Sequence, residues 1–221
     1  MNDARTHWLL AIALLAWPVA VMGAAGSDKL VLAIARAFPD GGGYDGKWGG
    51  HGVPEDIVFK GATILSKAKS SHGSYCCGFA FTVAMKAAAR RGLLADKTVA
   101  QVRAFQKHWY GCTKESRERQ CAMGVEVLGI GREVKLRDAR PGDFVMIWRA
   151  SGSGHSVVFL GWARDKGRRV GIRYRSSQGS TKGIGDLTEY FAGVKGKQGI
   201  DPKRTYVARL HTRRKRKASS R

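Results

Sequence analysis

Apolar residues in the first half of the chain recur at the spacing of helices. From Lys29 to Phe38 and from Lys97 to Trp109 they return at helical period, as on one face of an amphipathic helix. The stretch from Cys76 to Ala89 is apolar almost all round at its N-terminal end, which is typical of a buried helix, and Gly92 follows as a stop. A further helix is expected from Pro54 to Lys67, with the proline near its first turn.

Beyond Gly124 the pattern changes to the short apolar runs of β-strands, separated by glycine and aspartate turns. Two of these runs flank Asp165-Lys166-Gly167 and are expected to form a hairpin. Helices first and strands afterwards indicate an α+β domain, with N-terminal helices packed on a small antiparallel sheet. The predicted strands are 125–128, 144–148, 156–162, 170–175 and 206–210.

A glycine-rich stretch follows the first helix. Residues 40–52 carry Tyr44 and Trp48 among the glycines, so we expect a surface loop without helix or strand, whose aromatic side chains could line a cleft. Residues 26–53 are therefore an N-terminal helix and Gly-rich loop, and residues 54–211 are the main domain.

Both ends of the chain differ in composition from its centre. Leu9 to Val21 is a nearly unbroken apolar run between Arg5 and a group of small residues, so we assign residues 1–25 to a secretory signal peptide. The run is short for a membrane span; an uncleaved anchor and a buried helix are the alternatives. Residues 212–221 are expected to be a basic disordered tail. We therefore expect export to the periplasm, the cell envelope or the exterior, with no stable membrane span after signal removal.

The charge of the chain favours an anionic partner. Lys and Arg number 39 against 17 Asp and Glu, which gives a formal net charge of +22 in 221 residues, and such a field attracts polyanions of any kind. For an exported protein we expect peptidoglycan or another anionic polymer, or anionic lipid head groups. Nucleic acid is the weaker alternative, because an exported protein meets cell-wall polymers first.

Two adjacent cysteines stand where the buried helix begins. A helix N-terminus lowers the pKa of a thiol through its unpaired N–H groups and its dipole, and the thiolate is the reactive form of cysteine. Cys76 and Cys77 are therefore candidate nucleophiles, although a structural thiol is the more common role for cysteine on an apolar helix. His155, at the entrance of a predicted strand, is the candidate general base.

A third group is needed to orient the imidazole. In the predicted hairpin His155 lies opposite residues 176–178, and Gln178 can accept the imidazole N–H through its side-chain oxygen. Gln178 is therefore the candidate third residue. The residues that we expect to contact a substrate are Tyr75, His72, Trp48 and Ser177.

Three segments of the chain form a joint motif. They are Tyr75-Cys76-Cys77-Gly78-Phe79 at the start of a helix, Arg140-Pro141-Gly142-Asp143-Phe144 in a turn, and the strand from Gly154-His155 to Gly161. In this order and spacing they resemble the NlpC-type cell-wall peptidases and the related CHAP amidases, whose nucleophile stands in an Asp-Cys-Ser-Gly-Phe/Leu pattern. The resemblance spans roughly residues 54–180. Tyr75 and Cys77 replace the usual Asp and Ser, which leaves the choice between the two cysteines open.

The resemblance implies a papain-like fold with Cys76 as nucleophile and His155 as base. The third residue departs from the family's His or Asn, so Gln178 as orienting residue follows from the strand register alone. The resemblance also implies a secreted cysteine hydrolase that cleaves amide bonds of peptidoglycan stem peptides, at γ-D-glutamyl linkages or at the sugar-to-peptide amide. Such a reaction needs no metal and no organic cofactor. The alternative is an inactive protein on the same fold that binds a cell-wall or nucleic-acid polyanion through its charge.

Two further cysteines flank a polar segment. Cys112 and Cys121 enclose residues 113–120, so a disulfide that closes this loop is expected in an oxidising compartment, with two free thiols as the alternative. A zinc site is not expected, because no pairs of Cys or His recur at ligand spacing.

Overall fold

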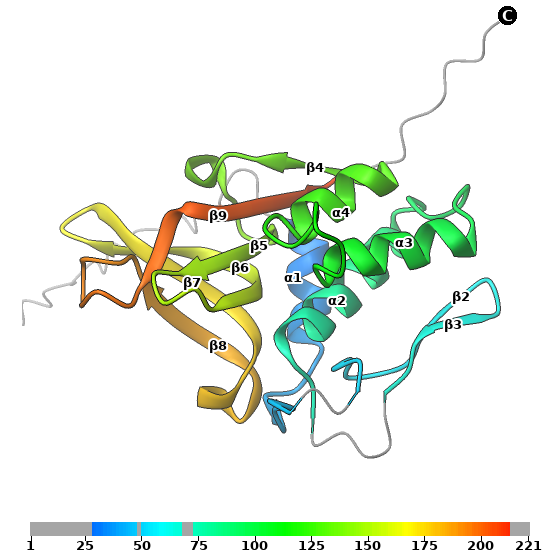
Figure 1. Cartoon of the computed structure of the whole chain (residues 1–221), viewed down its shortest axis with the longest axis horizontal. Helices are drawn as coiled ribbons and strands as arrows, with labels where there is room; N and C mark the ends of the chain where they lie inside the picture. Colours follow the sequence, from blue (N-terminus) through cyan, green and yellow to red (C-terminus); the bar gives the residue numbers. More distant parts are fainter. Residues whose placement is uncertain (1–27, 48–49, 68–72, 213–221) are drawn as a thin grey trace, which may run out of the picture.

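The described part of the chain is an α+β structure with an antiparallel sheet, as the sequence predicts. A computed structural model describes residues 28–47, 50–67 and 73–212, and the predicted signal peptide and residues 213–221 of the predicted tail lie outside them. The helices gather beside the sheet (Figure 1). Within the described ranges no helix is long and apolar enough to cross a membrane.

The helices and strands do not follow the predicted order of helices first and strands afterwards, because three short strands precede α2. The helices are α1 (Lys29–Arg36), α2 (Cys76–Arg90), α3 (Val99–Trp109) and α4 (Cys121–Leu128), with short 3-10 turns at Leu136–Asp138 and Gly179–Thr181. The strands are β1 (Gly41–Gly42), β2 (Ile57–Phe59), β3 (Ala62–Leu65), β4 (Gly131–Val134), β5 (Phe144–Arg149), β6 (Gly154–Asp165), β7 (Arg168–Gln178), β8 (Gly183–Tyr190) and β9 (Ile200–Leu210).

Seven of the described strands form one antiparallel sheet in the spatial order β1-β8-β7-β6-β5-β9-β4. The predicted hairpin is present as β6 and β7, and toward its open end Val158 lies opposite Arg175. Helix α2 packs against both strands of this hairpin. The start of α2 and the open end of the hairpin therefore meet in one place.

The helix predicted from Pro54 to Lys67 is wrong, because this stretch forms the separate hairpin β2–β3. Lys60 and Gly61 link the strands with positive φ angles of 48° and 77°, the backbone of a two-residue hairpin turn. Short apolar runs do not distinguish strand from helix, and β-branched residues favour the strand. The β-branched residues here are Ile57, Val58, Thr63 and Ile64.

The strand predicted at 125–128 is also wrong, because these residues end helix α4. The buried residues of α4 fall at helical spacing once the helix is followed from its true start: Cys121, Ala122, Gly124, Val125 and Leu128. The sheet is larger than expected, since β1, β4 and β8 were not predicted. β1 pairs with β8 inside the stretch expected to be loop only. The helices at 29–38, 76–89 and 97–109 are confirmed within a few residues.

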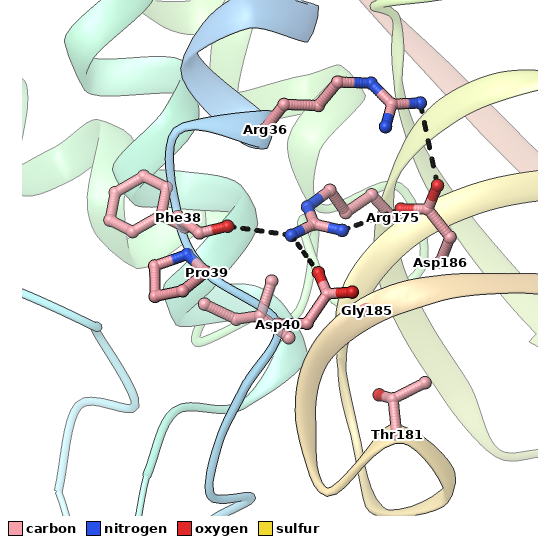
Figure 2. Close-up of a pocket in the computed structure, with 9 residues that line it drawn as sticks. Arg36, Phe38, Pro39, Asp40, Arg175, Thr181, Gly185 and Asp186 are labelled. Carbon is pink, nitrogen blue, oxygen red and sulfur yellow. Dashed lines mark hydrogen bonds and ion pairs between the residues drawn. The ribbon is translucent and has the colours of Figure 1, made fainter.

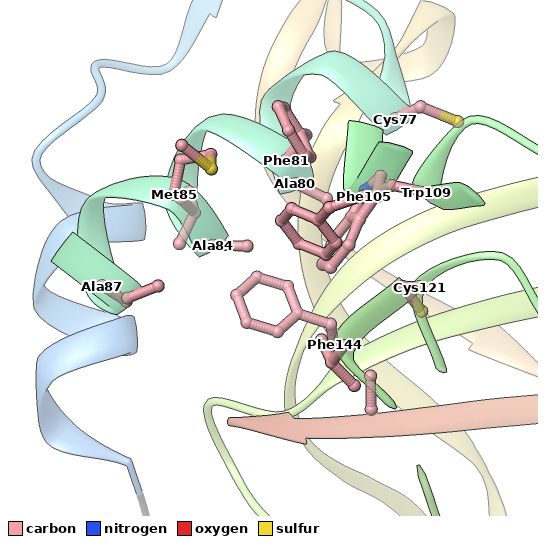
Figure 3. Packing of buried hydrophobic residues seen from close by; sticks show 14 of the residues in the cluster. Cys77, Ala80, Phe81, Ala84, Met85, Ala87, Phe105, Trp109, Cys121 and Phe144 are labelled. Atoms are coloured by element: carbon pink, nitrogen blue, oxygen red, sulfur yellow. The ribbon is translucent and has the colours of Figure 1, made fainter. Parts of the chain in front are cut away.

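Aromatic rings in tilted and edge-to-face contact hold α2 and α3 on the sheet (Figure 3). Phe81 of α2 lies 5.1 Å from Phe105 of α3, measured between ring centroids. Trp109, at the end of α3, lies 5.2 Å from Phe144 of β5 in an edge-to-face contact. All four rings are fully buried, and each adds packing energy to its apolar burial. This aromatic cluster sets the distance between α2 and the sheet.

The first turn of α2 touches another stretch of backbone directly. A β-carbon at Gly78 would lie 2.1 Å from the carbonyl oxygen of Gly52 and 2.3 Å from its carbonyl carbon. The same oxygen accepts a hydrogen bond from the backbone N–H of Tyr75 at 3.0 Å. Only glycine leaves room for this contact at position 78. The glycine of the sequence motif therefore sets where the helix begins.

Arg175 ties the N-terminal segment to β7, near the end of the strand (Figure 2). Its side chain is 5% exposed. The guanidinium donates hydrogen bonds to the carbonyl oxygens of Ala35 (3.0 Å) and Phe38 (2.8 Å) and to the carboxylates of Asp40 (2.6 Å) and Asp186 (2.8 Å). The end of α1 is thereby fastened to the strand that carries Gln178.

We expect Gly78→Ala to lower the free energy of unfolding by about 1–3 kcal/mol, because the added methyl group enters space filled by backbone. Helix propensity alone predicts the opposite sign, a gain of about 1 kcal/mol. Urea denaturation followed by circular dichroism measures the difference. Gly124→Ala in α4 is the control, since its new β-carbon would meet the Phe105 side chain at 3.2 Å and should be better tolerated. A Gly78→Ala protein as stable as the wild type would show that position 78 has room for a β-carbon next to Gly52.

We expect Arg175→Ala to lower the free energy of unfolding by about 2–3 kcal/mol, because two carbonyls and two carboxylates lose their donor. The loss is limited because Asp40 and Asp186 are solvent-accessible and can hydrate, and Asp186 also keeps its ion pair with Arg36. Arg173→Ala, an exposed arginine on the same strand, is the control and should change stability by less than about 0.5 kcal/mol. Equal losses of unfolding free energy in the two variants would show that the hydrogen bonds of Arg175 do not contribute to stability.

Candidate active site

Cys76 is the first residue of α2, and the helix start is buried. Cys76 is 6% exposed and Cys77 is 7% exposed. Tyr75 is the N-cap residue, has an extended backbone and gives the helix no side-chain hydrogen bond. The N–H dipoles of the first turn therefore act on the Cys76 sulfur without competition from a Tyr75 side-chain cap.

His155 and Gln178 meet at the open end of the β6–β7 hairpin. Gln178 Oε1 lies 2.9 Å from His155 Nε2, and His155 is 5% exposed. Because a carbonyl oxygen can only accept, Nε2 carries a proton, and Nδ1 is the ring nitrogen left to interact with a thiol. Tyr174 contacts the imidazole edge-on at 5.6 Å between centroids and restricts its rotation. The predicted contact of Gln178 with His155 is thus present.

The surroundings of Cys76 hold the pKa of its thiol well below the ordinary value. The largest cause is a hydrogen bond with the Cys77 thiol, whose sulfur lies 3.9 Å from the Cys76 sulfur. Burial opposes the shift, whereas the charge and hydrogen bonding of His155 and the backbone N–H of Ser156 support it. These groups favour Cys76 as a thiolate beside His155.

Cys77 has the opposite character. The hydrogen bond between the two thiols raises the pKa of the Cys77 thiol well above the ordinary value, and burial and the negative charge of Cys76 act in the same direction. Its sulfur lies 3.6 Å from Ser156 Oγ and 3.9 Å from Gln120 Oε1. Figure 3 shows Cys77 at the start of α2, away from the aromatic rings. Of the two sulfurs, Cys76 is therefore the one whose surroundings favour the thiolate.

Buried serine hydroxyls hold the turn before α2 against the hairpin. Ser74 Oγ donates to Ser177 Oγ at 2.9 Å, and Ser177 Oγ donates to the Ser74 carbonyl oxygen at 2.9 Å. Ser176 Oγ donates to the Ser156 carbonyl oxygen at 2.7 Å across the two strands. These bonds keep the start of α2 next to the strand positions that carry His155 and Gln178.

The residues predicted to contact substrate have different positions. Ser177 is fully buried and hydrogen-bonded to Ser74, so it fastens the fold instead of facing a ligand. Tyr75 is buried as well, with its hydroxyl donating to the Gly50 carbonyl oxygen at 3.3 Å. Trp48 and His72 lie outside the described residues.

Tyr44 of the Gly-rich stretch is next to the site. It pairs with Ser74 in a short parallel bridge. Burial raises the pKa of the Tyr44 phenol, and the nearby negative charge of Cys76 raises it further. The half-buried Tyr44 ring is therefore an aromatic group that a substrate near Cys76 could meet.

The disulfide predicted between Cys112 and Cys121 is not formed, and both are free thiols. Cys121 is buried at the start of α4, whereas Cys112 is exposed. Burial raises the pKa of the Cys121 thiol to about 12, so it stays protonated. Among the described residues no three His, Cys, Asp or Glu side chains gather as a metal site requires.

Three groups of the site were not predicted. Tyr174 lies on β7, the strand paired with the one that carries His155. It is an even number of residues from Gln178, so the alternation of side chains along a strand predicts that both lie on the same face. The backbone N–H of Ser156 reaches Cys76 only because the strand passes the helix start. Gln120 contacts Cys77 across 43 positions and has a φ of 37°, uncommon for a residue other than glycine. No local pattern in the sequence indicates that contact.

Comparisons with family models, with curated proteins and with solved structures found no match to this chain.

Proposed function

We propose that this protein is a papain-like cysteine hydrolase that cleaves amide bonds, with Cys76 as nucleophile, His155 as base and Gln178 as orienting residue. The observation that carries the proposal is the convergence of these three side chains from α2, β6 and β7. In particular, Gln178 holds one imidazole nitrogen at 2.9 Å while the thiol of Cys76 lies beside the same ring. A thiolate, a base and an orienting acceptor are the parts of a nucleophilic hydrolase.

In the first half-reaction the Cys76 thiolate attacks the amide carbonyl and forms a carbon–sulfur bond. The carbonyl electron pair moves to oxygen, and the resulting oxyanion accepts the backbone N–H of Cys76 at the helix N-terminus. Protonated His155 gives its Nδ1 proton to the leaving nitrogen as the carbon–nitrogen bond breaks. The products are a free amine and a thioester on Cys76.

In the second half-reaction neutral His155 takes a proton from water, which attacks the thioester carbonyl. The carbon–sulfur bond breaks, a carboxylic acid leaves, and Cys76 returns as thiolate next to protonated His155. Gln178 Oε1 accepts a hydrogen bond from the Nε2–H group throughout, so the ring keeps Nδ1 toward the sulfur in both steps.

The substrate that fits this proposal best is the peptide stem of peptidoglycan. The motif resemblance supports it, and so does the formal net charge of +22, which attracts the carboxylates of such stems. The apolar run of the predicted signal peptide supports export to the compartment where that polymer occurs.

A second candidate function is binding of a polyanion without catalysis. The observation that favours it is a basic surface at the closed end of the β6–β7 hairpin, where Arg169 stacks on Trp162 at 4.2 Å. Exposed arginines pair readily with phosphate and carboxylate groups. The exposed cations of the hairpin are Arg164, Lys166, Arg168, Arg169 and Arg173.

Iodoacetamide should modify Cys76 at pH 6, because a lowered pKa keeps the thiolate populated below the usual thiol range near pH 8.5. His155→Ala should slow this labelling at pH 6 by about tenfold or more, since a shift of one pKa unit changes the thiolate fraction tenfold. His108→Gln on α3 is the control and should label like the wild type. Peptide fragmentation in the mass spectrometer separates Cys76 from Cys77. Equally slow labelling of the wild type and His155→Ala would contradict the proposed pairing of Cys76 with His155.

Purified peptidoglycan incubated with the protein should release new peptide fragments, and Cys76→Ser should release none above background. Mass analysis of the soluble fraction identifies the bond, because each amide leaves a different pair of termini. Retention of both proteins on the insoluble polymer is measured in the same samples. Equal retention with no fragments from either protein would refute the hydrolase and support the polyanion-binding alternative.

A further inference from the structure

The two adjacent thiols at the start of α2 have neighbours of opposite kinds. Cys76 has neighbours that can donate to it: the backbone N–H of Ser156, the imidazole of His155 and the thiol of Cys77, whose sulfur is 3.9 Å away in a contact where either sulfur can be the donor. Each of these stabilises negative charge on the sulfur. Nothing in this set requires Cys76 to keep its own proton.

Cys77 is surrounded by acceptors. Gln120 Oε1, at 3.9 Å from the Cys77 sulfur, can only accept. Ser156 Oγ, at 3.6 Å, donates its own proton to Met146 Sδ at 3.6 Å, so it also faces Cys77 as an acceptor. Cys77 therefore retains its proton and has one S–H to give, and a thiolate on Cys76 is the strongest acceptor within reach.

We propose that Cys77 is a positioning residue, which donates its S–H to the Cys76 sulfur and thereby determines which of the two cysteines becomes the nucleophile. The inference rests on the proposed function in one respect, that Cys76 is the reacting thiol. It adds a role for the residue that stands where the resembling family has serine, and serine is also a hydrogen-bond donor.

The groups that face Cys76 and Cys77 come from several elements, and burial keeps most of them from changing protonation between pH 5 and 9. Burial raises the pKa of Tyr44, Tyr75 and Tyr110 above 10 and that of Cys121 to about 12. His155 also faces Cys76, and it is the same in each Cys77 variant compared below. A change in the pH profile on substitution of Cys77 therefore reports the hydrogen bond to Cys76.

The test is the rate of iodoacetamide labelling of Cys76 from pH 5 to 10 in the full chain. Cys77→Ala removes the donor and should slow labelling at pH 6 about tenfold, with the midpoint of the profile moved up by about one pH unit. Near pH 10, where Cys76 is ionised in either protein, the rates should agree. Cys77→Ser keeps a donor and should stay within about threefold of the wild type at pH 6.

Two further variants separate this role from simple packing. Cys77→Val fills the space of the sulfur without a donor and should behave like Cys77→Ala, so a cavity is not the cause if both shift. Cys121→Ala removes another buried thiol near the site and should leave the midpoint unchanged. Thermal unfolding of each variant confirms that the labelled protein is folded.

The outcomes distinguish this inference from the proposed function. A wild-type profile with a low midpoint that depends on His155, together with an unchanged midpoint in Cys77→Ala and Cys77→Val, would overturn the role of Cys77 alone. A uniform loss of rate at every pH, equal in Cys77→Ser and Cys77→Ala, would also overturn it, because a packing defect has no pH signature. A wild type whose Cys76 labels only above the ordinary thiol pKa would overturn both.

Discussion

Contact between the backbones of Gly78 and Gly52 fixes where helix α2 begins, and the site is arranged around that point. Because a β-carbon at position 78 would lie 2.1 Å from the Gly52 carbonyl oxygen, the first turn can approach this segment only with glycine there. Tyr75 is fastened to the same oxygen, and Ser74 is fastened to β7 through Ser177. The backbone position of Cys76 is thus set by a main-chain contact together with buried serine hydroxyls.

Enclosure strengthens each polar contact in this region. The two sulfurs, the imidazole and the Gln178 amide are all less than one tenth exposed, so their hydrogen bonds operate in a medium of low effective dielectric. In such a medium, whether each neighbouring group donates or accepts a hydrogen bond matters more than how many neighbours there are. Two thiols next to each other in sequence can consequently differ widely in acidity, as the opposite pKa directions of Cys76 and Cys77 indicate.

Local sequence rules were sufficient for the parts of the site that lie on single elements. Helical period located the start of α2 at Cys76, and the turn at residues 165–167 set the register that brings Gln178 to His155. The ranking of the two cysteines was beyond such rules, because Ser156 and Gln120 reach them from distant elements. The β2–β3 hairpin and α4 were misassigned for a related reason: short apolar runs fit either period, and tertiary packing selects one.

The hairpin β6–β7 carries both His155 and Gln178, whereas Cys76 belongs to the helical layer packed on it. The imidazole and the amide therefore share one mechanical support, and the Cys76 thiol has another. A loosening of α2 from the sheet would lengthen the path from sulfur to imidazole and leave the imidazole–amide bond unchanged. Loss of reactivity would then precede loss of the sheet, and it would be reversible as long as the aromatic cluster around Phe81 can close again.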